Sequence, residues 1–164
     1  MLVRSDGSQV AVRTPAKLNL FLEVLGRRAD GYHELETLMV AVSLFDSLHF
    51  SPRNDGRIRL SCRWSLGHEA GVVRAERTGR LAAWDLLPPE QTNLVWRAVE
   101  KLRQRAGVES GIDIQLIKNI PSAAGLGGAS SDAAAARDAH AAMTARVSVD
   151  QRKRGDICDC LPGG

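Results

Sequence analysis

The spacing of apolar and polar residues predicts a hairpin near the start of the chain. Residues 17–25 alternate with a period of two, which is typical of a half-buried strand. One predicted face carries Leu18, Leu20, Leu22 and Val24, and the other carries Asn19, Phe21 and Glu23. A second apolar run over residues 35–44 is expected to pair back against the first. Between them stands Asp30-Gly31, a dipeptide suited to a tight reversal.

Shorter patterns predict further strands and one irregular segment. Extended segments are expected over residues 10–13, 47–50, 57–62 and 111–118, the last with clear alternation. Residues 62–90 show no clear period and contain several glycines. We interpret them as a long surface insertion, which could contain a further hairpin.

Two helices are expected in the second half of the chain. The first should begin at an N-cap formed by Thr92-Asn93 and end at Gly107, because apolar residues recur along one stripe between them. The second should be an alanine-rich helix from residue 129 to about residue 142. Together these elements predict an α+β domain over residues 1–145. Residues 146–164 have no periodicity and are expected to form an unpacked tail.

Composition narrows the class of protein. With 164 residues, 44% hydrophobic and 25% charged, the chain fits one soluble domain. The net charge of +3 is spread along the chain and aromatic residues are few, so a nucleic-acid partner is not favoured. No apolar run is long enough to cross a membrane, and we expect a cytoplasmic protein without a membrane partner. The 3 cysteines include no Cys-x-x-Cys pair, and we predict no metal site. The tripeptide Cys158-Asp159-Cys160 could bind a metal, but chance explains it better.

The segment with the clearest chemistry is a loop rich in glycine and serine, between a predicted strand and a predicted helix. It reads Pro121, Ser122, Ala123, Ala124, Gly125, Leu126, Gly127, Gly128, Ala129, Ser130 and Ser131. Free backbone amides and the positive end of a helix dipole would together suit a phosphate. The loop lacks the Gly-Lys-Ser/Thr of a Walker A motif, and Ser130 stands where Gly-x-Gly-x-x-Gly needs its third glycine. A glycine turn that merely caps a helix is the alternative, with Asp132 only complementing the dipole.

Two stretches together resemble a known family. Pro-x-x-x-Gly-Leu-Gly-Gly-x-Ser-Ser-Asp-Ala-Ala, from Pro121 onward, resembles the second motif of the GHMP kinases, where the loop wraps the ATP phosphates. The sequence Thr-Pro-Ala-Lys-Leu-Asn-Leu-Phe-Leu from Thr14, followed by Arg-Ala-Asp-Gly-Tyr-His-Glu-Leu from Arg28, resembles the N-terminal signature of one branch of that family. The resemblance spans roughly residues 10 to 136 in order, interrupted by residues 62–90.

The resemblance implies a fold and an activity. It implies the α+β N-terminal domain of the family, with a mixed, antiparallel-rich sheet, helices on one face and the C-terminal domain absent. The implied reaction is ATP-dependent phosphorylation of the 2-hydroxyl of 4-diphosphocytidyl-2-C-methyl-D-erythritol, in the non-mevalonate route to isoprenoid precursors. ATP is the implied co-substrate, with Mg²⁺ expected beside it. The alternatives are a catalytically inactive nucleotide-binding fragment and a GHMP kinase that acts on another small alcohol.

The resemblance also implies roles for single residues. Lys17 is the implied catalytic lysine, and Asn19, on the same strand face, is the implied hydrogen-bond partner of the substrate. Tyr32 and His33 match the pair that recognises cytidine. Nucleotide contacts are implied for residues 121–131 and, at the border of the adenine and ribose pocket, for Asn93 and Lys118. Without the motifs, the two lysines would be interpreted as surface charges, Asn93 as a helix cap, and Tyr32 and His33 as ordinary surface residues.

The sequence also departs from the family. Members have a Gly-Ala-Asp-Val-Pro segment after the phosphate-loop helix and a third glycine-rich motif, and neither is in the 164 residues. The pattern is lost near Arg137, as a truncated or frameshifted reading frame would produce. Translating the encoding DNA in its other two frames beyond codon 136 tests that hypothesis.

Overall fold

The computed structural model describes residues 1–6, 9–82 and 85–158, with side chains described up to residue 144. A five-stranded sheet has the strand order β1-β2-β3-β5-β4, in which β4 and β5 are parallel and the other neighbours are antiparallel. The strands are β1 (Leu2–Asp6), β2 (Gln9–Arg27), β3 (His33–Arg53), β4 (Ile58–Trp64) and β5 (Gly111–Lys118). The helices are α1 (Leu66–Arg77), the 3-10 turn η2 (Glu90–Thr92), α2 (Leu94–Ala106) and α3 (Gly128–Cys158).

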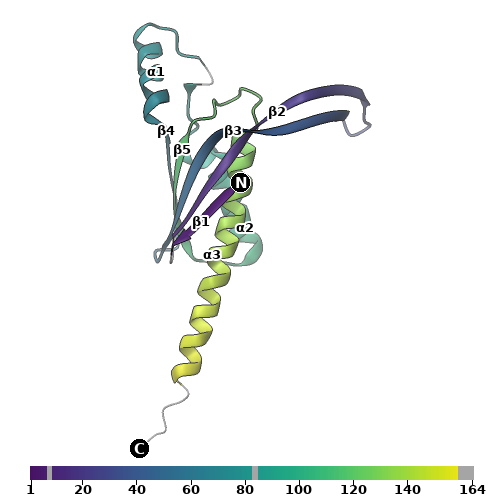
Figure 1. The fold of residues 1–164 in the computed structure, drawn as a ribbon. Helices are drawn as coiled ribbons and strands as arrows, with labels where there is room; N and C mark the ends of the chain where they lie inside the picture. The colour runs from purple at the N-terminus through teal and green to yellow at the C-terminus, as the bar shows by residue number, and fades with distance from the viewer. Residues whose placement is uncertain (7–8, 83–84, 159–164) are drawn as a thin grey trace, which may run out of the picture.

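Helices α2 and α3 lie side by side against one face of the sheet, as Figure 1 shows. The core lies between these layers, where Leu48, Phe50 and Ile114 of the sheet are completely buried. The helices contribute Val99 of α2 and Ala136 of α3 to the same core. The prediction of an α+β domain with a mixed sheet and helices on one face is therefore confirmed.

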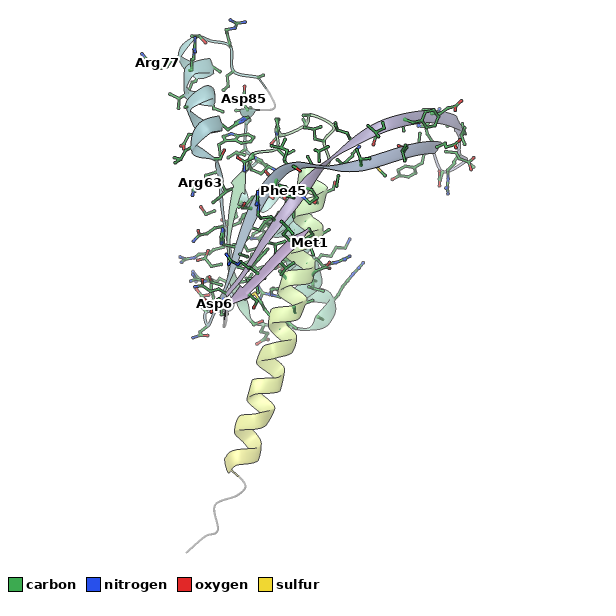
Figure 2. All side chains as sticks on the ribbon, viewed as in Figure 1. Met1, Asp6, Phe45, Arg63, Arg77 and Asp85 are labelled. Carbon is green, nitrogen blue, oxygen red and sulfur yellow. The ribbon has the colours of Figure 1, made fainter. Side chains whose placement is uncertain are left out.

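The predicted hairpin forms, but its burial and its faces were predicted wrongly. Strands β2 and β3 pair along residues 17–27 and 33–41, and Gly31 turns the chain with a φ of 87°. The hairpin extends beyond the rest of the sheet, and its side chains project into open space (Figures 1 and 2). Leu20 and Val24 are 62% and 59% exposed, so this part of β2 is not half-buried. A register shift between Asn19 and Phe21 breaks the alternation, because Leu18 pairs with Val40 but Leu22 pairs with Thr37.

Helix α2 and strand β5 follow their predictions closely. Helix α2 begins where expected, because the Asn93 side chain accepts a hydrogen bond from the Val95 amide at 2.9 Å. It ends at Gly107, whose φ of 62° is left-handed. Strand β5 covers the predicted residues 111–118. These local signals were sufficient because caps and alternation act within a few residues of each other.

Two segments differ from expectation. Part of the 62–90 insertion is helical rather than a hairpin, since α1 occupies Leu66–Arg77 with no buried residue. Helix α3 continues to Cys158, beyond the expected end near residue 142. The separate tail over 146–164 stays a prediction, because its side chains lie outside the described ones, as does part of Cys158-Asp159-Cys160. Among the described residues, no helix has both the length and the apolarity that a membrane crossing requires.

Candidate functional site

A cleft of about 650 Å³ opens where the glycine loop joins β5 to α3. Its volume lies within the range of small-molecule sites. The lining residues come from the loop and the start of α3, from β4 and β5, from the end of the 62–90 insertion and from the start of α2: Cys62, Leu86, Leu87, Pro88, Pro89, Thr92, Asn93, Leu94, Leu116, Lys118, Asp132 and residues 121–130. The cleft therefore gathers every residue predicted to contact nucleotide except Ser131.

The loop backbone adopts the conformations of an anion-binding turn. Ala123, Gly125 and Gly127 have φ values of 58°, 73° and 71°. A non-glycine residue at positive φ is uncommon and marks a conformation held by its surroundings, as at many functional sites. The Ser131 amide donates to the Gly127 carbonyl at 3.0 Å, which starts α3 directly after the loop. The cleft thus contains the N-terminal end of a long helix, where backbone amides favour negative charge.

Lys17 lies directly on this loop. Its backbone amide donates to the Leu126 carbonyl at 2.9 Å, which fastens β2 to the loop. A Cβ atom at Gly127 would stand 2.9 Å from Lys17 Cγ, so the lysine side chain needs a glycine there. Lys17 Nζ donates to Asn19 Oδ1 at 3.0 Å. The structure thus brings Lys17 and the loop together, with Asn19 beside Lys17, and their roles stay predictions.

Tyr32 and His33 are not part of this group. They lie at the far end of the β2–β3 hairpin, where Tyr32 is 75% exposed. The Tyr32 amide donates to Asp30 Oδ1 at 3.1 Å within the turn itself. The strand between Lys17 and this turn would span roughly 30 Å if it were fully extended. Their role in recognising cytidine stays a prediction.

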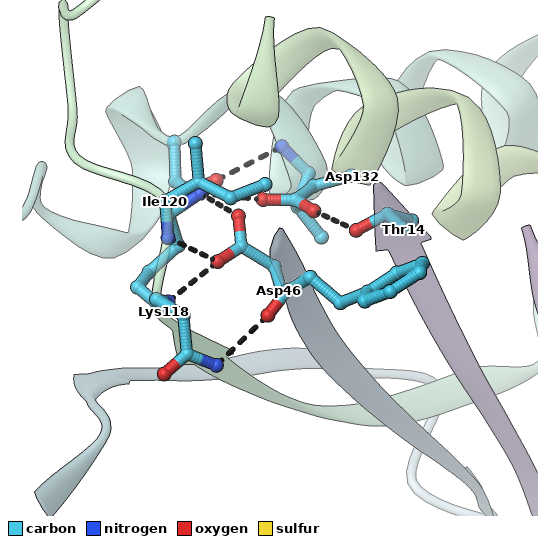
Figure 3. A network of polar contacts seen from close by, with 9 residues as sticks. Thr14, Asp46, Lys118, Ile120 and Asp132 are labelled. Carbon is cyan, nitrogen blue, oxygen red and sulfur yellow. Dashed lines mark hydrogen bonds and ion pairs between the residues drawn. The ribbon is translucent and has the colours of Figure 1, made fainter. Parts of the chain in front are cut away.

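Beneath the loop lies a buried polar network that the sequence did not predict (Figure 3). Lys118 Nζ donates to Asp46 Oδ2 and, at 2.9 Å, to Asp132 Oδ2. Thr14 Oγ1 donates to Asp132 Oδ1 at 2.5 Å. Asp46 and Asp132 are 0% and 1% exposed. Lys118 was predicted to border the nucleotide pocket, and it does line the cleft, but its ammonium group is held by these two carboxylates.

The network sets the protonation of its members. Burial, with the carboxylate of Asp46 nearby, raises the pKa of Asp132 to about 6, although Lys118 and Thr14 act in the opposite direction. The pKa of Lys118 is raised, because the two carboxylates outweigh the effect of its burial. Burial also raises the pKa of Cys62 to about 11, so the thiol at the cleft stays protonated at neutral pH and is not a ready nucleophile.

Sequence reasoning missed Asp46 and Thr14 and treated Asp132 as a complement to the helix dipole. Thr14 and Asp132 are 118 residues apart in sequence, and Asp46 and Lys118 are 72 apart. A local signal existed only for Asp132, which follows the first turn of α3 directly. Among the described residues, no three histidine, cysteine, aspartate or glutamate side chains gather in a way that could hold a metal ion.

Comparison with known sequences identifies the family. Residues 93–157 match the family described as the GHMP kinases N terminal domain. The chain is 46% identical over 124 residues to the 4-diphosphocytidyl-2-C-methyl-D-erythritol kinase of Rhodopirellula baltica, a match that covers 74% of this chain and 37% of that protein. It is 47% identical over 121 residues to the kinase of the same name from Pelotomaculum thermopropionicum, covering 74% and 35%. The matched region thus spans little more than a third of these relatives' length.

Solved structures agree with the sequence comparison. A crystal structure of 4-(cytidine 5'-diphospho)-2C-methyl-D-erythritol kinase superimposes with a TM-score of 0.59 at 36% identity, covering 82% of this chain and 40% of the other. The mevalonate kinase of Methanococcus jannaschii, at 17% identity and a TM-score of 0.51, shares the fold, with 84% of this chain and 41% of the other covered. By sequence and by fold, the chain therefore belongs to the GHMP kinase family, of which it carries the N-terminal domain.

Proposed function

We propose that this chain binds ATP at residues 121–131, as the nucleotide-binding part of a cytoplasmic kinase. The proposed reaction transfers the γ-phosphoryl group to the 2-hydroxyl of 4-diphosphocytidyl-2-C-methyl-D-erythritol, in the non-mevalonate route to isoprenoid precursors. The names of the relatives support this substrate. The observation that carries the proposal is the cleft, which combines a glycine loop and a helix N-terminus, with the side chain of Lys17 laid against Gly127 of its lining.

The proposed roles follow from how phosphoryl transfer is catalysed. The transition state spreads negative charge over the transferred group, so catalysis comes mostly from positioning and charge stabilisation. The loop amides would hold the phosphates, and the Lys17 ammonium would lie beside the reacting hydroxyl and favour its anionic form. Asn19, hydrogen-bonded to Lys17, would orient the substrate hydroxyls. Tyr32 and His33 would recognise the cytosine ring.

Magnesium would enter the site with the ATP. Both oxygens of Asp132 already accept hydrogen bonds, from Thr14 and Lys118, so this carboxylate is not a free metal ligand. The exposed Ser130 hydroxyl lines the cleft and is of a ligand type that Mg²⁺ accepts. A hydroxyl, phosphate oxygens and water would form the oxygen-rich shell that Mg²⁺ prefers. When bound, the metal would neutralise charge on the phosphates.

One competing function is favoured by a specific observation. The matched region covers 37% of the Rhodopirellula relative, and the competing function is nucleotide binding without completed catalysis. In that case ATP binding would remain and turnover would be missing. A GHMP kinase with another alcohol substrate is the remaining alternative, and it would leave Tyr32 and His33 without a role in turnover.

Titration calorimetry with ATP and a coupled assay of ADP formation separate these cases. The proposal expects saturable ATP binding by the purified chain, weakened in a Gly127→Val variant. ADP formation that depends on the cytidyl substrate and is lost in Lys17→Ala would support the full reaction. Binding without turnover would support the nucleotide-binding fragment. Absence of any ATP binding would refute the proposal as a whole.

A further inference from the structure

The glycine loop leaves the sheet and enters α3 through two short stems, and both stems meet one buried carboxylate. The first stem, Asn119 and Ile120, follows β5 directly. Their amides donate to Asp46 Oδ1 at 2.6 Å and 2.9 Å. Figure 3 shows Asp46 facing the start of this stem from β3, with Lys118 on its other oxygen. A carboxylate that accepts two adjacent amides fixes the direction in which the chain leaves the strand.

The second stem lies against the same group. A Cβ atom on Gly128 would stand 3.2 Å from Asp46 Oδ2 and 2.9 Å from Ile120 Cγ2, so the start of α3 lies against both. Lys118 extends the connection, because its ammonium group bridges Asp46 and Asp132, near the start of α3. Thr14 of β2 donates to the far oxygen of Asp132. Four elements are therefore joined below the loop.

Asp46 takes no direct part in the cleft. It is 0% exposed and is absent from the residues that line the cleft. Its charge pairs with the buried ammonium group of Lys118, but a carboxylate beneath an anion site also opposes phosphate binding. Asp46 and Asp132 together carry more negative charge than the single ammonium group of Lys118 can neutralise. The hydrogen bonds of the Asp46 carboxylate go to Lys118 and to the two amides of the first stem, which are groups that hold the loop in place.

We propose that Asp46 is a positioning residue that fixes the phosphate-binding conformation of residues 121–131 by clamping both stems of the loop. This inference rests on the proposed function, since it concerns how the same loop holds ATP. The clamp determines where the loop amides point and does not contact the adenosine part of the nucleotide. Loss of the clamp should therefore weaken binding of phosphates and leave binding of the nucleoside unchanged.

The test compares ATP with adenosine on an Asp46→Asn variant. Asparagine has nearly the same shape, but it loses the charge and turns an amide group toward Lys118. The expected result is about a tenfold loss of ATP affinity, because two hydrogen bonds to the stem amides lose their charge assistance and one ion pair is lost. Adenosine affinity should stay within about twofold. Calorimetry is performed at a temperature where circular dichroism shows that the variant is folded.

Matched variants separate positioning from general damage. Asp113→Asn alters another aspartate of the same sheet, which pairs with Arg53 at 3.4 Å and does not line the cleft, and it should change neither affinity. If Asp46→Asn does not fold, Thr14→Val removes the outer hydroxyl of the clamp at nearly constant volume and should produce a smaller loss for ATP alone. Equal losses for ATP and adenosine, or no loss for either, would overturn the inference. Wild-type chain that fails to bind ATP would refute the proposed function itself, and this inference with it.

Discussion

Replacing Lys118 with methionine tests the buried network most severely. The substitution keeps the length of the side chain and removes its ammonium group, which is held by Asp46 and Asp132. Both carboxylates would then stay buried without a cation, at 0% and 1% exposure. Removing one partner of a buried ion pair costs about 3–5 kcal/mol, because the remaining charge has lost both water and its partner. We expect a loss of that size in the free energy of unfolding at pH 7.

The loss should shrink in acid, and this pH dependence identifies its cause. Without the ammonium group, the pKa of Asp132 rises further in the folded chain, while in the unfolded chain it stays near 3.8. At pH values between the unfolded and the folded pKa, the folded variant binds more protons than the unfolded variant does. The stability of the variant relative to wild type therefore increases as pH falls. Urea unfolding followed by circular dichroism at pH 7 and pH 5 measures both effects.

Lys101→Met on the exposed side of α2 is the matched control for Lys118→Met. It should change stability by no more than about 0.5 kcal/mol at either pH. A Lys118→Met variant as stable as this control would refute the reasoning about the network. So would a loss of equal size at pH 7 and pH 5, since an unpaired carboxylate must respond to protonation.

Three further predictions concern single residues. Gly127→Ala should weaken ATP binding and reduce stability more than Gly79→Ala. Both glycines have positive φ, but only the new Cβ at residue 127 would push into Lys17. Calorimetry and urea unfolding of the two variants measure the difference in ATP affinity and in stability. The pKa of Asp132 rises from 3.8 to about 6, which corresponds to roughly 3 kcal/mol. Wild-type stability should therefore decrease between pH 4 and pH 7 relative to Asp132→Asn. A difference in stability between the two proteins that stays constant across this range would contradict the shift. His140 of α3 is 3% exposed, and burial lowers its pKa below 6.5. The unfolded chain therefore binds a proton at His140 more readily than the folded chain does, and the stability of the protein should decrease below pH 6.5. Thermal melts should show a smaller decrease for His140→Leu than for wild type.

Local chemistry made part of the fold predictable. Helix α2 could be bounded from Asn93 and Gly107, because a cap and a left-handed glycine are properties of adjacent residues. The alternation of β5 was equally local. Helix α1 was not predicted, because it buries no residue and so needs no apolar stripe. The burial of the hairpin was predicted wrongly for a different reason. Alternation shows that one face of a strand is apolar enough to be buried, but it does not show whether another element covers that face.

The candidate site was predictable only where it follows a contiguous motif. The loop over residues 121–131 and its neighbour Lys17 could be found, because glycines and a lysine in a fixed sequence order carry the family resemblance. Asp46 could not, because its importance depends on reaching Lys118, 72 residues away, and in sequence it is one acid among 19. Such pairings are set by how β3, β5 and α3 pack, which single-residue patterns do not encode.

The central claim is that the amides of residues 121–131 bind the phosphates of ATP. Backbone amide chemical shifts of ¹⁵N-labelled chain, recorded during titration with Mg-ATP, test it most directly. The account predicts that the largest changes fall on the loop amides and the first turn of α3, and that adenosine alone leaves the loop amides nearly unchanged. Saturation with ATP that leaves these amides unmoved, or moves amides elsewhere on the sheet instead, would contradict it.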